Sequence, residues 1–211
     1  MIELGALLIR EGSSEDHLDS LLTALFEDFG IDIHIDPFPF ERNRKSLDAA
    51  FSDAKDRYAE KQLYLVHRDA DNAGRAKRLS EIEKARESSG LESETVPVIP
   101  VKETEAWILH ALHFQEFCEA IEVPQALVQG RLPKMSRIAE VNAKERLKEI
   151  HDVIYENRGS GRSRRRRKPA FTTSRSRWIA ELSKPEWLED CESFHNLRLD
   201  AERSLQELQL L

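Results

Sequence analysis

Four apolar segments, each followed by a stretch with helical spacing of apolar positions, dominate the first half of the chain. Three are continuous runs, which predict buried strands over residues 4–10, 63–67 and 94–101. The other, residues 31–35, alternates apolar with polar residues and predicts a half-exposed strand near a sheet edge. Apolar side chains recurring every three or four residues predict the intervening helices, over residues 15–29, 44–60, 73–88 and about 104–119.

The order of these elements predicts the fold class. Strand and helix alternate with connections too long for hairpins, which favours an α/β fold with a mostly parallel four-stranded sheet flanked by helices. After residue 124 the pattern changes to helix over 136–155, a Gly/Ser/Arg-rich stretch, and further helix. We therefore expect a domain at residues 1–122 and a helical C-terminal extension at 123–211, with a mobile Arg-rich loop at about 157–176.

Charge is distributed unevenly along the chain. The net charge of the 211 residues is −7, yet the segment from Arg158 to Arg177 holds nine Lys or Arg and no acid. Removing these nine from 32 basic residues leaves 23 against 39 acidic ones, a net −16. The chain is thus an acidic body that carries one concentrated basic segment.

Composition also restricts the setting. No apolar stretch approaches the roughly 20 residues needed to span a bilayer, and the N-terminus lacks the features of a secretory signal. Cys118 and Cys191 are isolated and have no metal-binding or redox spacing. We expect a cytoplasmic protein without a membrane association.

Acidic residues follow three of the predicted strands. They are Glu11 and Glu15, Asp69 and Asp71, and Glu103 and Glu105. Ligands of open α/β sheets bind beyond the carboxyl ends of the strands, so these acids are expected to converge on one crevice. Clustered carboxylates favour hard divalent ions, which predicts one or two Mg²⁺ or Mn²⁺ ions.

Each of these acidic segments also has a structural explanation. Glu11 and Glu15 suit the N-terminal end of a helix, where acids are stabilised by the helix dipole. Asp69 and Asp71 suit a turn that caps the next helix, and Glu103 and Glu105 suit a cap as well. It is their joint occurrence after successive strands that favours a metal site.

The succession Glu11-Gly12-x-x-Glu15, then Asp69-x-Asp71, then Glu103-x-Glu105 followed by Ala and Trp, resembles the Toprim domain. It is most similar to the stand-alone compact Toprim-like proteins of the overcoming-lysogenization-defect nuclease branch, which are often encoded beside an ATPase. The resemblance covers roughly residues 1–120 and rests on the order and strand placement of the motifs.

The resemblance implies roles for individual residues. Glu11 matches a glutamate that binds metal or acts as general acid or base, and Glu15 matches a second metal-facing glutamate. Asp69 and Asp71 match the Asp-x-Asp metal ligands. Glu103 and Glu105 fall where the nuclease branch supplies acids for a second metal. The candidate catalytic residues are accordingly Glu11 and Glu105. Lys102 is a third candidate because of its position beside the acidic cluster, where a cation would steady a phosphate; a salt bridge to a neighbouring acid is the alternative.

The basic segment is a candidate nucleic-acid contact. Arginine clusters bind phosphates, and a solvated loop with no such role is the alternative. The candidate contact residues are Arg162, Arg164, Arg165, Arg166, Arg167 and Lys168.

These features together predict a metal-dependent phosphodiesterase, an endonuclease cutting DNA or RNA, as the effector of a phage-defence system with a separate ATPase partner that the resemblance implies. The alternative is a non-catalytic Toprim-fold subunit that binds a partner protein. Nucleotidyl transfer has no supporting nucleotide motif. An apolar C-terminal segment is a candidate for docking on a partner or on a second copy, as in a homo-oligomer; it contains Leu205, Leu208, Leu210 and Leu211.

Overall fold

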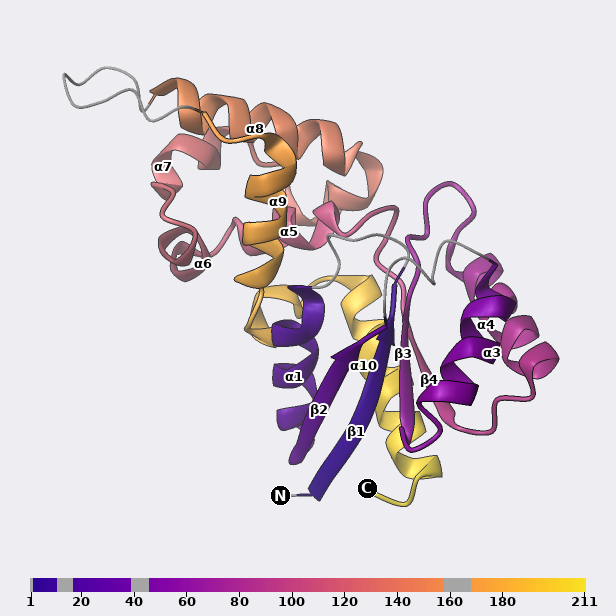
Figure 1. Cartoon of the computed structure of the whole chain (residues 1–211). Helices are drawn as coiled ribbons and strands as arrows, with labels where there is room; N and C mark the ends of the chain where they lie inside the picture. Colours follow the sequence, from indigo (N-terminus) through magenta and orange to yellow (C-terminus); the bar gives the residue numbers. More distant parts are fainter. Residues whose placement is uncertain (1, 11–16, 39–45, 158–167) are drawn as a thin grey trace.

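A computed structural model describes residues 2–10, 17–38, 46–157 and 168–211, with the side chain of Asn157 excepted. Its centre is a four-stranded sheet in the order β2-β1-β3-β4, and all neighbouring strands are parallel (Figure 1). The strands are β1 (Ile2–Ile9), β2 (Ile31–Pro37), β3 (Leu63–His67) and β4 (Glu94–Val98). The predicted α/β class and parallel sheet are confirmed, and the alternating segment at residues 31–35 does form an edge strand.

Helices cover both faces of this sheet. Helices α1 (Asp19–Glu27) and α10 (Glu192–Glu207) pack on one face, and α3 (Leu47–Arg57) and α4 (Arg75–Ser89) cover the other. Strand β1 explains why the apolar runs are continuous. Its residues Leu4, Ala6 and Leu8 enter the core beneath α1 and α10, whereas Leu7 and Ile9 enter the core beneath α3 and α4. Successive strand side chains point to opposite faces, so a strand buried on both sides needs apolar residues throughout.

A group of helices lies beyond the carboxyl ends of the strands (Figure 1). It comprises α5 (Glu105–Ala111), α6 (Gln115–Ala120), α7 (Gln125–Val128), η2 (Gln129–Arg131), η3 (Met135–Glu140), α8 (Ala143–Asn157), α9 (Phe171–Ala180) and η4 (Pro185–Leu188). We call these elements the helical lobe. The chain then returns to the sheet as α10, whose residues Leu197, Ala201 and Leu205 are buried in the same cluster as Val96 of β4.

Three details differ from the expected helix boundaries. The helix expected over about 104–119 is divided into α5 and α6. The one expected over 136–155 is divided into η3 and α8, because Asn142 Oδ1 accepts the Glu145 N–H at 3.1 Å and begins a new helix. The expected loop over 157–176 is also shorter, since residues 171–176 belong to α9.

The boundary predicted at residue 122 stays a prediction. Residues on both sides of it contribute to one hydrophobic cluster, which joins α1 and the sheet to α5, α8, α9 and α10. The position of α10 on the sheet bears directly on whether residues 1–122 fold alone.

Candidate functional site

The loops that leave β3 and β4 run side by side beyond the strands. The N–H of Ala70 donates to the Pro100 carbonyl at 3.2 Å, and the N–H of Asp71 donates to the Lys102 carbonyl at 2.8 Å. These two hydrogen bonds extend the parallel pairing past the ends of both strands. They therefore bring Asp69 and Asp71 next to the segment that carries the predicted glutamates.

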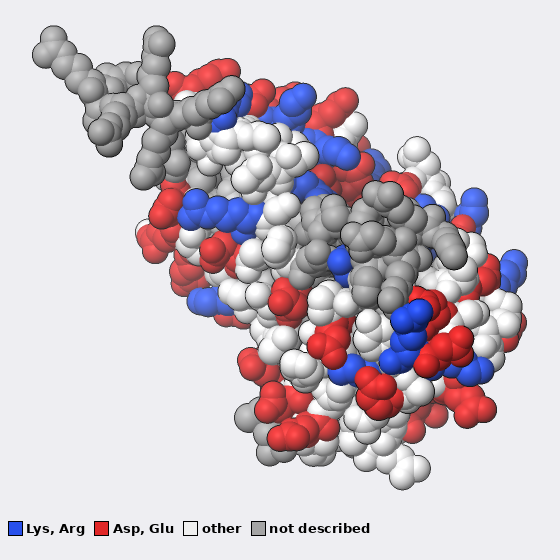
Figure 2. All heavy atoms as spheres, viewed as in Figure 1, with Lys and Arg blue, Asp and Glu red and all other residues white. Residues whose placement is uncertain are grey.

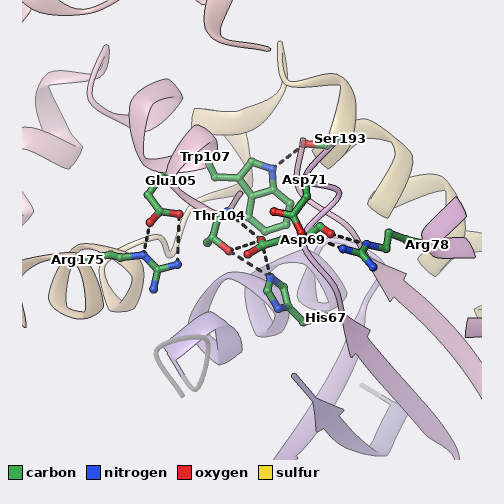
Figure 3. A network of polar contacts seen from close by, with 9 residues as sticks. All are labelled: His67, Asp69, Asp71, Arg78, Thr104, Glu105, Trp107, Arg175 and Ser193. Atoms are coloured by element: carbon green, nitrogen blue, oxygen red, sulfur yellow. Dashed lines mark hydrogen bonds and ion pairs between the residues drawn. The ribbon is translucent and has the colours of Figure 1, made fainter. Parts of the chain in front are cut away.

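Asp69 is held by the start of α5. Its Oδ1 accepts a hydrogen bond from the Thr104 N–H at 3.2 Å and lies 3.4 Å from the Thr104 hydroxyl. His67 Nε2 lies 3.1 Å from the same hydroxyl and 3.6 Å from Asp69 Oδ1 (Figure 3). His67 and Thr104 are both buried. The Asp69 carboxylate is thus oriented by groups from two elements, and His67 acts in that arrangement as a structural histidine.

Asp71 points instead toward α4. Its backbone has φ +46°, in the left-handed region that few non-glycine residues adopt. Arg78 Nη2 donates to Asp71 Oδ2 at 2.9 Å, and Arg78 Nε donates to the Asp69 carbonyl oxygen at 2.8 Å. The side chain of Asp71 is 47% exposed while that of Arg78 is 12% exposed. Arg78 therefore supports the Asp69–Asp71 turn from its inner side.

Glu105 is buried and engaged in an ion pair. It is 1% exposed, and its Oε1 and Oε2 accept hydrogen bonds from Arg175 Nε at 2.7 Å and Arg175 Nη2 at 3.3 Å. Figure 3 shows the two side chains facing each other, one from α5 and the other from α9. This ion pair holds α9 against the first turn of α5, which directly follows the strand-end loop.

Glu103 is close enough to Glu105 and Asp71 for both of these acids to influence its pKa. Its Oε2 is buried and has no hydrogen-bond donor among the described residues. Burial raises the pKa of Glu103, and the neighbouring Glu105 and Asp71 raise it further. Lys144 and Arg175 oppose that rise in the pKa of Glu103. The electrostatic influence of both neighbours indicates that the acids from the ends of β3 and β4 share one region.

Lys102 lies in the loop between β4 and α5. Its φ is +61°, and its Nζ donates to the Val141 carbonyl at 3.2 Å. This contact links the loop to the short connection between η3 and α8. The catalytic role expected for Lys102 stays a prediction.

The remaining predicted residues fall mostly outside the described part of the chain. They are Glu11, Glu15, Arg162, Arg164, Arg165, Arg166 and Arg167. Lys168 is described and exposed, and its Nζ lies 2.8 Å from Asp152 Oδ1. Figure 2 shows acidic side chains spread across the visible face with basic side chains among them, as expected for an acidic body.

The carboxylates fit a hard divalent cation, but two of them are already paired with arginines. The described residues contain no group of three or more His, Cys, Asp or Glu arranged to hold a metal ion. Asp71 and Glu105 are each neutralised by an arginine. The carboxylate oxygens of Asp69, Asp71 and Glu103 are of the type that Mg²⁺ and Mn²⁺ prefer, and the unsatisfied Glu103 Oε2 is a group that a cation would satisfy.

Sequence reasoning missed Arg78, Thr104 and Arg175. Arg78 follows Asp71 by seven residues in the next helix, and its basic side chain just after an acidic turn is a weak local signal. Arg175 is 70 residues from Glu105, and no local pattern relates them.

A second polar chain lies within the helical lobe. His151 Nε2 is 3.1 Å from Ser174 Oγ, and His151 Nδ1 is 3.3 Å from Asp152 Oδ1. The connectivity is that of a serine-hydrolase triad, but Ser174 is only 4% exposed. Burial lowers the pKa of His151, partly opposed by Asp152. The ring also packs against Phe171 and Trp178, so this chain fastens α8 to α9.

Comparison with known proteins gives no further guide. No family model, curated protein or solved structure matches the chain. Within the described residues, every helix is too short or too polar to traverse a lipid bilayer.

Proposed function

We propose that this chain is a metal-dependent phosphodiesterase, an endonuclease that cuts DNA or RNA. The observation that carries the proposal is that Asp69, Asp71 and Glu103 lie in two adjacent loops at the carboxyl edge of a parallel sheet, where α/β folds bind their ligands. The buried and unsatisfied Glu103 Oε2 supports it, because native proteins rarely leave such an atom without a partner.

Under this proposal Asp69, Asp71 and Glu103 hold Mg²⁺ or Mn²⁺, together with Glu11 and Glu15. A bound divalent ion neutralises phosphate charge and lowers the pKa of a water molecule. Thr104 keeps the Asp69 carboxylate in one orientation through its N–H group. Glu105 contributes by holding Arg175 rather than by facing the ion directly, because both of its oxygens accept hydrogen bonds from that arginine.

The substrate class follows from the basic segment. Phosphodiester backbones are bound by clustered arginines, with an affinity that falls as salt rises. The segment containing Arg162, Arg164–Arg167 and Lys168 is the proposed backbone contact. A separate ATPase partner, a role in phage defence and a cytoplasmic setting are proposals that rest on the Toprim resemblance and on composition.

The test is cleavage of plasmid, single-stranded DNA and tRNA in the presence of MnCl₂. Asp69→Asn keeps an oxygen that accepts the Thr104 N–H but removes the charge, so cleavage should fall by about 100-fold or more, as for loss of a group that acts on the transition state. Glu83→Gln is the matched control, since it removes one exposed charge from α4 and should cleave like the wild type. Equal cleavage by wild type and Asp69→Asn would refute the proposal.

A second candidate is a non-catalytic subunit that uses this edge only to bind a partner protein. The observation that favours it is the pairing of Asp71 with Arg78 and of Glu105 with Arg175, which satisfies two of the acids without a metal. Calorimetric titration with MgCl₂ and MnCl₂ distinguishes the two functions. The non-catalytic subunit should show no binding that disappears in Asp71→Asn.

A further inference from the structure

Within the described part of the chain, Arg78 contacts three oxygen atoms at once. Its Nε donates to the Asp69 carbonyl at 2.8 Å, its Nη2 to Asp71 Oδ2 at 2.9 Å, and its Nη1 to Glu81 Oε2 at 2.9 Å. In Figure 3 the guanidinium lies against the turn that carries the two aspartates. A planar guanidinium fixes the direction of each of these hydrogen bonds. Arg78 thus joins the proposed site to an acid outside it.

The main chain of Asp71 is held firmly, whereas its side chain is free to rotate. The backbone of Asp71 is fixed by its left-handed conformation and by its hydrogen bond to the Lys102 carbonyl. Its carboxylate is 47% exposed and so has solvent on one side. Rotation of the Asp71 side chain away from Arg78 therefore needs no movement of the main chain.

Glu81 supplies Arg78 with a second counter-charge. It lies three residues further along α4, and Arg78 is the main cause of the lowered pKa of Glu81. An arginine that is largely buried is costly to leave without an acidic partner. Because Glu81 stays in place, Arg78 keeps a partner when Asp71 turns elsewhere.

We propose that Arg78 is a positioning residue that serves as the internal counter-ion of Asp71, and that Glu81 takes over Arg78 when Asp71 turns to a divalent cation. This inference rests on the proposed function, in which Asp71 is a metal ligand. Arg78 keeps the Asp69 carbonyl and Glu81 in both states and exchanges only its contact with Asp71.

The exchange predicts that the effect of Glu81 on cation binding depends on Arg78. An ordinary surface ion pair predicts no such dependence. Without the charge of Glu81, Arg78 holds Asp71 more tightly and a cation competes less well. Loss of a nearby negative charge also weakens cation binding through space, so the single substitution is not decisive. The contribution that passes through Arg78 is isolated by a double-mutant cycle.

The experiment is calorimetric titration of the full chain with MnCl₂, using Glu81→Gln, Arg78→Met and the double variant. Glu81→Gln should weaken Mn²⁺ binding roughly tenfold when Arg78 is present and less than about twofold when it is Met, a difference typical of residues in one ion-pair network. Glu83→Gln, on the same helix, measures the general effect of one lost charge. Arg78→Gln replaces Arg78→Met in the cycle if circular dichroism shows that the latter is unfolded.

The outcomes separate this inference from the proposed function. A tenfold effect of Glu81→Gln that persists unchanged in the Arg78→Met background would overturn the exchange, as would an effect no larger than that of Glu83→Gln. In those cases wild-type Mn²⁺ binding that is lost in Asp71→Asn would still support the metal site. If the wild-type chain does not bind Mn²⁺, the metal site itself is wrong and the inference fails with it.

Discussion

Arg175 of α9 and Glu105 of α5 form a buried ion pair in which the guanidinium donates two hydrogen bonds to the carboxylate, at 2.7 and 3.3 Å. The pair joins α9 to the first residue of α5, which directly follows the strand-end loop. Both residues are at most 9% exposed. Its main consequence is structural, because it holds α9 against α5 at the edge where the proposed site lies.

We expect Arg175→Met to destabilise the protein by about 3–5 kcal/mol, since it leaves the Glu105 charge buried without its partner. Arg177→Met is the matched control. Its guanidinium pairs with Glu122 at the surface, and the loss should be within about 1 kcal/mol. Urea unfolding measures both. The double variant Arg175→Met with Glu105→Gln should recover part of the loss, and equal costs for the two single arginine variants would contradict this account.

Residues 1–122 are expected not to fold by themselves. This fragment lacks α10, whose residues Leu197, Ala201 and Leu205 bury the face of the sheet next to Val96. Exposed apolar surface of that kind removes the main driving force for folding. Circular dichroism and amide hydrogen exchange of the fragment should show no cooperative unfolding.

A fragment ending at residue 207 is the control for this truncation. It retains α10 and loses only the last four residues. Leu208 and Leu210 among them are partly buried against the core and Leu211 is exposed, so the fragment should be less stable than the whole chain but should still unfold cooperatively. Cooperative unfolding of residues 1–122 would instead support the domain boundary that the sequence predicts.

Local features of the fold follow from the sequence more readily than contacts such as the Arg175–Glu105 pair or the packing of α10. Strand β3 was predicted at its observed bounds, Leu63–His67, because polar residues flank a short apolar run on both sides. The placement of Asp69 and Asp71 followed, since a residue just after a strand must lie at the edge of the sheet. Periodicity failed where one polar residue, Asn142, begins a new helix inside a continuous apolar pattern.

Long-range partners were beyond prediction. Arg175 belongs to the basic segment in the sequence and falls within the loop expected at about 157–176, but the fold places it in α9, in the interior beside Glu105. The return of α10 to the sheet is a similar case. Its apolar stripe predicts burial but does not identify the surface that it covers.

Substitutions of Lys102 distinguish the effect of its backbone conformation on stability from the effect of its side chain on activity. With φ at +61°, every residue except glycine is strained there, by about 1–2 kcal/mol. Lys102→Gly should therefore be more stable than Lys102→Ala by about 1 kcal/mol, although both variants lose the Nζ contact with the Val141 carbonyl. Thermal unfolding tests this difference. If Lys102 also steadies a phosphate, the two variants lose nuclease activity equally, whereas activity that follows stability would contradict that role.

The stability of the protein should fall between neutral pH and about pH 4 because of His110. This side chain is 6% exposed, and its Nδ1 has no hydrogen-bond partner among the described residues. Burial, together with nearby His113, lowers the pKa of His110 from 6.5 to about 4, with Asp190 opposing the shift. The unfolded chain therefore binds a proton at a higher pH than the folded chain, so stability is complete above about pH 6.5 and is lost as the pH falls toward 4.

Urea unfolding of wild type and His110→Gln at pH 7.5, 6 and 5 measures this contribution; these values bracket the ordinary histidine pKa of about 6.5. His110→Gln should reduce the loss of stability on acidification, because glutamine does not take up a proton in this range. Part of the loss should remain, since the pKa of buried His151 is lowered as well. The control is His195→Gln, which makes the same substitution at an exposed histidine of α10 and measures the effect of the exchange away from the core. If His110→Gln loses as much stability on acidification as the wild type, another group causes the loss. His110 would then have the same pKa in the folded and unfolded chains.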